Sequence, residues 1–245
     1  MSQSLYLAHM RPKLYRLLPW ADRQGLIPDR GQGDLGYAFH AALRAAFSDL
    51  APQPFSYKEN QGLLAYSENG EAIKAAAALA PPEIADMLGL DESSQSPGLL
   101  VRSFPSVWKE GQLLAFEVRV RPIVRSKDGR ERDAFLVAIE QSRFENQSRP
   151  VVYINWLKRQ FAEAAVIKEV SMTAFHLSSV MRRIASQSDG NRPKRTLLGP
   201  DVAFSGVLEI NDRHSFENLL RRGIGRHRAF GFGMLLLKPI NAGAY

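Results

Sequence analysis

Near the end of the chain stands the sequence Gly223-Ile224-Gly225-Arg226-His227-Arg228-Ala229-Phe230-Gly231-Phe232-Gly233, in which four glycines are interspersed with arginines and phenylalanines. A helical pattern at 215–222 precedes it, and an apolar run at 234–239 with the length of a buried strand follows. Glycine permits close backbone approach and arginine suits phosphate. We therefore interpret the segment as a loop between a helix and a strand that can hold a polyanion. The alternative is a helix cap followed by tight turns without a ligand.

The composition indicates a globular protein that binds a polyanion. Of the 245 residues, 45% are hydrophobic and 23% charged, which suits one large domain or two ordinary ones. Lys and Arg number 32 against 25 Asp and Glu, a formal charge of +7. There is no cysteine, which excludes disulfides, thiolate zinc sites and a cysteine nucleophile. Because neither a leader nor a membrane-length apolar run is present, we expect a cytoplasmic protein with no membrane partner.

The first half of the chain predicts alternating strands and helices. A helix that begins after Asp34 carries apolar residues at spacings of three and four. The predicted order is strand, helix, strand, strand, helix, strand, at 5–10, 34–47, 55–58, 63–67, 71–79 with a short turn of helix at 83–88, and 99–104. This order is that of a ferredoxin-like domain. Between its first strand and first helix lies a long connection, 11–34, that includes Arg23.

The second half of the chain fits the same pattern more loosely. We predict a long strand at 112–124 whose basic face carries Arg119 and Arg121, a turn at 127–130 and a returning strand at 134–140. The later predicted elements are a helix at 151–164, extended chain at 166–177, a strand at 203–210, the helix at 215–222 and a last strand. We place a domain boundary near 106–111. The predicted fold class is α+β, with two tandem ferredoxin-like (RRM-like) domains at 1–107 and 108–245.

A second basic segment lies outside the glycine-rich loop. Within 178–195 there are five basic residues and one acidic residue, Asp189. We interpret the region around 178–200 as a projecting helical or hairpin finger suited to a nucleic-acid groove, and the alternative is a solvated loop. The candidate RNA-binding residues are Arg182, Arg183, Arg192, Lys194, Arg195, Arg222, Arg226, Arg228, Arg119 and Arg121.

The catalytic candidates lie on the first helix. The sequence lacks a phosphate loop, a nucleophile elbow and paired histidines at metal spacing, so we expect neither a metal site nor a cofactor. His40 follows Tyr37 by three residues, which places both side chains on one helix face. Such a pair can exchange protons with a hydroxyl and a phosphate without a metal. The alternative for the pair is ordinary helix surface or packing.

Two stretches resemble a known family. The C-terminal residues 204–212, 223–225 and 231–237 are similar to the signature of the CRISPR RNA-processing endoribonucleases, above all the CasE branch of type I-E systems, with the type IV processing protein as a near relative. The helix 36–43 matches that branch's catalytic helix, and Tyr37 and His40 fall where its Tyr-x-x-His pair falls. The resemblance covers both ends of the chain, whereas 60–200 matches in pattern only.

The resemblance implies a function. It implies two ferredoxin-like domains that bind the hairpin of a CRISPR repeat transcript, cut at its 3′ base without a metal, and remain on the product beside other Cas subunits. The RNA's own 2′-hydroxyl attacks the phosphate and gives a 2′,3′-cyclic phosphate. His40 is then general base or acid, Tyr37 orients the 2′-hydroxyl or assists proton transfer, and Arg23 stabilises charge on the phosphorane.

Three hypotheses remain open from the sequence. The longer first loop and the larger, more basic insertion favour the type IV relative, in which we expect a helical finger and arginines at the scissile phosphate. A catalytically silent hairpin-binding subunit of a CRISPR complex would keep the glycine-rich loop without needing His40. A general basic nucleic-acid-binding protein would lack hairpin specificity.

Overall fold

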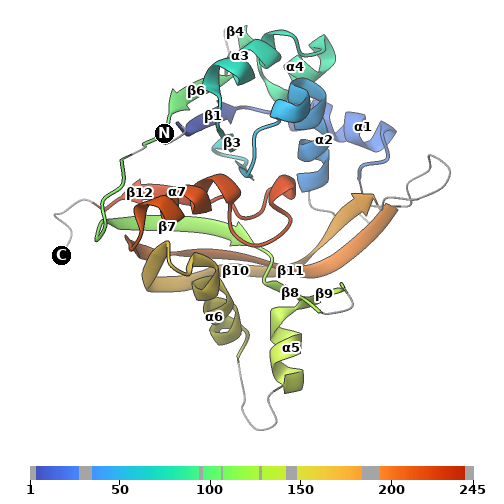
Figure 1. Cartoon of the computed structure of the whole chain (residues 1–245). Helices are drawn as coiled ribbons and strands as arrows, with labels where there is room; N and C mark the ends of the chain where they lie inside the picture. The colour runs from blue at the N-terminus through green and yellow to red at the C-terminus, as the bar shows by residue number, and fades with distance from the viewer. Residues whose placement is uncertain are drawn as a thin grey trace. The chain divides into compact units, whose positions relative to one another are not determined.

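The computed structural model divides into two compact units (Figure 1). The described residues are 4–27, 35–93, 96–105, 107–126, 129–141, 148–183 and 194–240. The first unit comprises Met1–Phe104, Ser178–Leu198 and Ala229–Gly231, and the second comprises Pro105–Leu177, Gly199–Arg228 and Phe232–Tyr245. The glycine-rich segment therefore contributes residues to both units.

The first unit contains a four-stranded antiparallel sheet in the order β2-β3-β1-β6. Its strands are β1 (Tyr6–Met10), β2 (Phe55–Lys58), β3 (Gly62–Ser67) and β6 (Leu100–Ser103). In the register of the central strand, Ala8 lies opposite Ala65 on one side and Val101 on the other. A separate short hairpin pairs β4 (Glu92–Ser93) with β5 (Ser96–Pro97). The strand order confirms the predicted ferredoxin-like topology of the first half.

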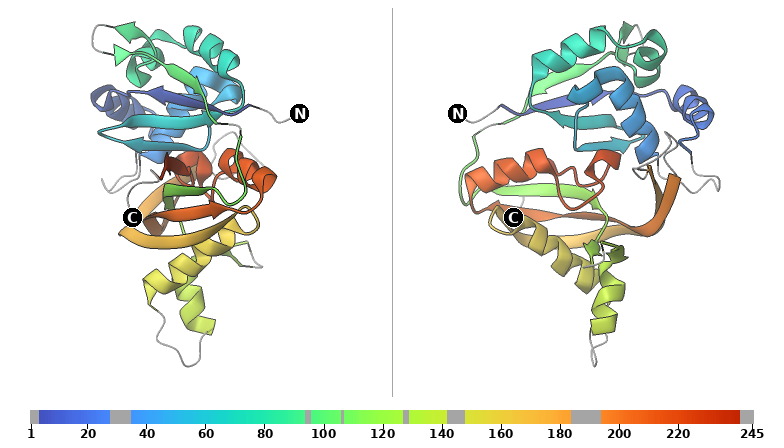
Figure 2. Two further views of the ribbon diagram at one scale, coloured as in Figure 1. Left: turned by 90° about the vertical axis from the view of Figure 1, so that its left-hand side faces the viewer. Right: turned by 45° about the vertical axis from the view of Figure 1, so that its right-hand side comes forward.

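Helices cover one face of this sheet, as Figure 2 shows. They are α1 (Leu14–Arg23), α2 (Gly36–Phe47), α3 (Gly70–Ala78) and α4 (Pro82–Leu88), and a 3₁₀ turn at Ser48–Leu50 ends the second. The apolar stripe of α2, with Phe39 and Leu43, packs into a core that also includes Met10 of β1. The Asn69 side chain accepts a hydrogen bond of 3.0 Å from the Ala72 amide and so caps α3. The predicted cap of α2, Asp34, lies outside the described residues.

The second unit repeats the same topology, with its strands in the order β10-β11-β7-β12. The strands are β7 (Leu113–Val120), β10 (Ala165–Arg183), β11 (Lys194–Ile210) and β12 (Leu236–Pro239). Gly206 is required in β11 because a Cβ there would lie 2.0 Å from the Glu169 carbonyl oxygen of β10. Two sheets of identical order confirm the prediction of two tandem ferredoxin-like folds.

The helices of the second unit are α5 (Ala134–Gln141), α6 (Arg149–Phe161) and α7 (Arg213–Arg222). A small hairpin of β8 (Ile123–Arg125) and β9 (Glu131–Asp133) precedes α5. The Asp212 side chain caps α7 by accepting a hydrogen bond of 2.7 Å from the Ser215 amide. The helix ends at Gly223, whose φ of +72° is left-handed. Within the described residues, no helix is long and apolar enough to cross a membrane.

Two sequence predictions need correction. The strand expected at 134–140 is α5, because the Asp133 carboxylate accepts a hydrogen bond of 2.8 Å from the Phe135 amide and starts a helix there. The strand expected at 112–124 is interrupted before Pro122, which offers no N–H to a ladder. The finger, predicted as helical or as a hairpin, is flanked by the strands β10 and β11, and its residues 184–193 lie outside the described part of the chain.

Candidate active site

The predicted pair Tyr37 and His40 lies on α2, one helical turn apart. Phe39 and Leu43 of the same helix are almost fully buried, which orients α2 and leaves the Tyr37–His40 face half-buried. The ring centroids of Tyr37 and His40 are 6.2 Å apart. Phe230 from the glycine-rich segment packs on both, stacked on Tyr37 at 5.6 Å and edge-on to His40 at 5.2 Å. The structure thus brings together two motifs that the sequence places almost 200 residues apart.

Glycine at 231 permits this packing. Gly231 has a φ of +82°, and a Cβ at this position would lie 3.1 Å from Phe55 Cε2. A side chain here would be strained in its backbone and crowded against the Phe55 ring. The preference for glycine therefore has a structural cause in the first unit, independent of any ligand.

The pKa of His40 lies below its ordinary value of 6.5. Burial is the largest cause, and the positive charge of Arg44 on the next helical turn lowers it further. A hydrogen bond with the Ala229 backbone acts in the opposite direction and is the weakest of the three effects. The imidazole is consequently neutral at pH 7 and able to accept a proton.

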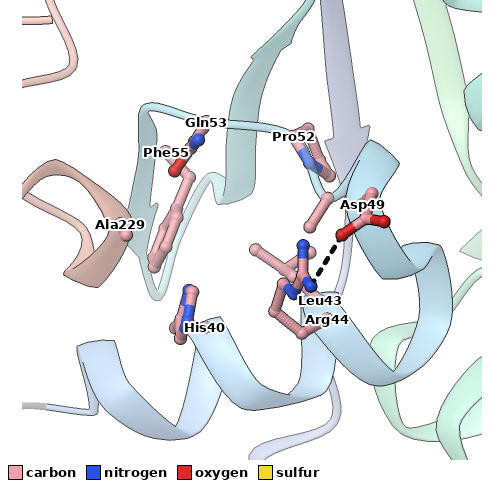
Figure 3. Close-up of a pocket in the computed structure, with 9 residues that line it drawn as sticks. His40, Leu43, Arg44, Asp49, Pro52, Gln53, Phe55 and Ala229 are labelled. Atoms are coloured by element: carbon pink, nitrogen blue, oxygen red, sulfur yellow. Dashed lines mark hydrogen bonds and ion pairs between the residues drawn. The ribbon is translucent and has the colours of Figure 1, made fainter. Parts of the chain in front are cut away.

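A cavity of about 340 Å³ opens beside His40 (Figure 3). Its lining residues come from α2, the chain that follows it and the glycine-rich segment: His40, Leu43, Arg44, Asp49, Ala51, Pro52, Gln53, Phe55 and Ala229. Arg44 donates from Nη2 to Asp49 Oδ1 over 2.9 Å, so the guanidinium is held at one side of the cavity. The sequence predictions did not include Arg44, although residues four apart on a helix lie on the same face and Arg44 follows His40 by four.

Arg23, the predicted phosphorane stabiliser, does not line this cavity. It is the last residue of α1, not part of a loop as expected. Its side chain is 60% exposed and Nη2 pairs with Glu83 Oε1 of α4 at 2.8 Å. The apolar face of α1, with Leu17 and Trp20 buried, explains why this stretch folds as a helix.

The arginines of the glycine-rich loop lie in the second unit, where Glu131 binds Arg226. Glu131 accepts one hydrogen bond from Arg226 Nε and contacts His227 Nε2 through its other oxygen, both at 2.8 Å. Arg228 donates from Nη1 to the Arg222 carbonyl oxygen at 2.6 Å. Burial, together with the charges of Arg222 and Arg226, lowers the pKa of Arg228. Three clustered arginines repel one another, and an anion bound to them would offset this repulsion.

Of the basic strand face predicted at Arg119 and Arg121, the Arg119 side chain is 35% exposed and Arg121 is buried. Arg119 makes a two-bond contact with Asp201, with Nε to Oδ1 at 2.9 Å, and Asp201 is 1% exposed. Arg121 is 2% exposed, and its guanidinium lies 5.6 Å from the centre of the Phe232 ring. A Cβ at Gly199 would lie 2.5 Å from Arg121 Nη2. Arg121 is therefore enclosed by the fold, which corrects its expected exposure, whereas Arg119 keeps a partly exposed side chain beside Asp201.

The remaining RNA-binding candidates belong to the finger. Arg192 lies outside the described residues. Arg182 and Arg183 end β10, and Lys194 and Arg195 begin β11, but the positions of their side chains are not described. The backbone therefore assigns these four residues to the two arms of one hairpin.

Comparison with known proteins defines the class of protein. The family model described as CRISPR associated protein matches residues 5–239, so this chain belongs to that family. It is 26% identical over 141 residues to the CRISPR-associated endoribonuclease Cse3 of Thermus thermophilus, covering 56% of this chain and 61% of that protein. It is 31% identical over 130 residues to the CRISPR system Cascade subunit CasE of Escherichia coli, covering 53% of this chain and 60% of that protein.

These matches span about three fifths of the length of the two curated relatives. Among solved structures, the chain resembles a CRISPR endoribonuclease Cse3 bound to a 19-nucleotide RNA. The TM-score is 0.63 at 18% identity, and the match covers 98% of this chain and 100% of that one. At this identity the likeness shows a shared fold.

Proposed function

We propose that this protein is a metal-independent endoribonuclease that cuts CRISPR repeat transcripts at the 3′ base of the repeat hairpin. The observation that carries the proposal is His40, whose lowered pKa leaves it neutral at the edge of a cavity, next to Tyr37 and Phe230. Membership of the CRISPR-associated family and the similarity to an endoribonuclease, Cse3, support RNA cleavage in a CRISPR system. After cleavage the protein stays on the crRNA beside other Cas subunits.

The proposed reaction needs only proton transfer and charge stabilisation. His40 accepts the proton of the 2′-hydroxyl, and the 2′ oxygen forms a bond to phosphorus as the bond from phosphorus to the 5′ oxygen breaks. The products are a 2′,3′-cyclic phosphate and a 5′-hydroxyl, whose proton comes from water. Tyr37 orients the 2′-hydroxyl. A positioned general base of this kind contributes about 10²- to 10⁴-fold to the rate.

Charge that develops on the phosphorane requires a cation within reach. Arg44 is our first candidate for this cation, because its side chain borders the same cavity as His40. Arg23 stays a second candidate: its exposed ion pair with Glu83 is of the weak kind that a phosphate can replace.

We assign binding of the hairpin to the arginines in and beside the glycine-rich loop and to the finger. Arg222, Arg226 and Arg228 would contact the RNA backbone. The stem would be held by the basic residues of the finger, Arg182, Arg183, Arg192, Lys194 and Arg195. Double-stranded RNA is recognised mostly by shape and by phosphate contacts, which suits such a set of cations. Affinity should fall steeply as salt rises.

The test is cleavage of a labelled repeat hairpin in EDTA, with binding measured in parallel. We expect the wild type to cut, His40→Ala to bind without cutting, and His214→Ala, an exposed histidine of α7, to behave as wild type. A 2′-deoxy nucleotide 5′ of the cut should abolish cleavage. If His40→Ala still cuts while Arg23→Ala does not, the site is arginine-based. If the wild type binds tightly but never cuts, the protein is a silent crRNA-binding subunit.

A further inference from the structure

We propose that the cavity beside His40 is a nucleobase pocket for the unpaired nucleotide immediately 3′ of the cut, with Gln53 and Arg44 contacting the edge of a purine. The inference rests on the proposed function, because that function places the cut, and with it the nucleotides on both sides, beside His40. It deepens that function by naming what determines specificity at the cut.

The wall of the cavity is mostly polar, with a smaller apolar part among Leu43, Ala51, Pro52 and Phe55. Polar groups suit the hydrogen-bonding edge of a nucleobase, and the apolar part suits its face. The cavity's volume of about 340 Å³ lies at the lower end of the range for small-ligand sites, about 300–1,000 Å³. All nine lining residues belong to the first unit. The pocket is thus a feature of one folded unit.

Two polar side chains on the lining can determine which base is bound. Gln53 carries an amide with two donors and an acceptor, and Arg44 carries a guanidinium in an exposed ion pair with Asp49 at 2.9 Å. Figure 3 shows Gln53 above Phe55 and His40, with Arg44 and Asp49 on the other side of the cavity. Glutamine pairs with N6 and N7 of adenine, and arginine with O6 and N7 of guanine. Both side chains favour a purine.

The pairing state of the RNA decides which nucleotide can enter. The nucleotide 5′ of the cut closes the hairpin stem, so its base is held in a pair. The nucleotide 3′ of the cut is unpaired, and unpaired bases can be splayed out and stacked in protein pockets. It also carries the 5′ oxygen that leaves during cleavage. A base held in the cavity would therefore restrict the position of this leaving group relative to the attacking oxygen.

The test separates base recognition from cutting. Five hairpins differ only in the nucleotide 3′ of the cut, which is A, G, C, U or abasic, and each is also made uncleavable by a 2′-deoxy nucleotide 5′ of the cut. Affinity is measured on the uncleavable set and single-turnover cleavage on the other. We expect the purine hairpins to bind and to be cut about 10- to 100-fold better than the abasic one.

Gln53→Ala should reduce this purine preference while leaving the abasic hairpin unchanged. Gln61→Ala replaces an exposed glutamine of the β2–β3 turn and should keep the full preference. Equal affinity of the wild type for all five uncleavable hairpins, or an unchanged preference in Gln53→Ala, would overturn the proposal. Failure to cut any hairpin, with purine-dependent binding intact, would contradict the proposed reaction and leave the pocket standing.

Discussion

Helices α2 and α6 occupy the same place in the two sheets, between the first and second strand of each, yet their aromatic pairs have different surroundings. Both carry rings at the same spacing, Tyr37 with His40 on α2 and Tyr153 with Trp156 on α6. On α6 the rings are 0% and 3% exposed, whereas on α2 they are half-buried and His40 borders a cavity. Helical spacing alone therefore does not distinguish a site from a core.

The polar atoms of the α6 pair have structural partners. The Tyr153 hydroxyl donates to the Asp133 carboxylate at 2.9 Å and accepts from Arg149 Nη1 at 3.0 Å. Burial, followed by this contact with Asp133, raises the pKa of the Tyr153 phenol. Trp156 donates its indole N–H to the Ile123 carbonyl oxygen at 3.2 Å. Polar groups that are already hydrogen-bonded within the protein stabilise the fold. His40 has a lowered pKa instead, which leaves a neutral imidazole available as a base.

The largest effect should come from Trp156→Ala. Removal of a fully buried indole should lower the free energy of unfolding by about 3–5 kcal/mol. Urea denaturation measures the loss, and cleavage per folded molecule should stay near the wild-type rate. A variant that keeps its stability but cannot cut would show that α6 takes part in catalysis, and would contradict the distinction between the two helices.

The two tyrosines should separate stability from activity. Tyr153→Phe leaves Asp133 and Arg149 without a buried hydroxyl, which should cost about 1.5–3 kcal/mol. Tyr37→Phe should change stability by less than about 0.5 kcal/mol and instead slow single-turnover cleavage. Equal stability losses, with no change in cleavage for either variant, would argue that both tyrosines are structural.

Two glycines of one segment offer a matched pair. Gly225 and Gly231 both have positive φ, and a Cβ would meet Trp156 Cη2 at 2.8 Å in the first case and Phe55 Cε2 at 3.1 Å in the second. Alanine at either position should cost about 1–2 kcal/mol from backbone strain. We expect cleavage to fall in Gly231→Ala only, because Phe55 lines the cavity. Loss of cleavage in Gly225→Ala but not in Gly231→Ala would contradict the assignment of the active site to the cavity beside His40.

The smallest effect concerns the arginines. Arg222 is exposed whereas Arg121 is 2% exposed. Arg222→Ala should weaken hairpin binding modestly and lower the slope of log affinity against log salt by about one. Arg121→Met should leave that slope unchanged, because a buried side chain releases no counterion from RNA. An equal change of slope in both variants would indicate that Arg121 reaches the RNA.

The sequence predicts much of the architecture, because strand and helix patterns are local. Short apolar runs and helical spacing predict the four strands of the first sheet and the helix that carries His40. The segment 134–140 was mistaken for a strand because Phe-Leu-Val and Ile favour strands, and the decisive cap by Asp133 is a single hydrogen bond. Propensity gives way to capping and packing at such positions.

The site is less predictable because it depends on distant partners. The sequence predicts that Tyr37 and His40 share a face, but Phe230 and the lowered pKa of His40 emerge only when remote segments pack together. The burial of Arg121 likewise depends on Phe232 and Gly199, which are far along the chain. The cavity needs Pro52 and Gln53 from the turn after α2, and no motif marks them.

The most direct test of the central claim is the pH dependence of single-turnover hairpin cleavage in EDTA, for wild type and His40→Ala. Because burial and Arg44 lower the pKa of His40, the base form dominates above its ordinary value of 6.5 and is lost only at lower pH. We predict that the wild-type cleavage rate rises with pH, with the midpoint of the rise below pH 6.5, and then levels off. His40→Ala should lack this acid limb and be about 10²- to 10⁴-fold slower. The same acid limb in His40→Ala, at a comparable rate, would contradict the account.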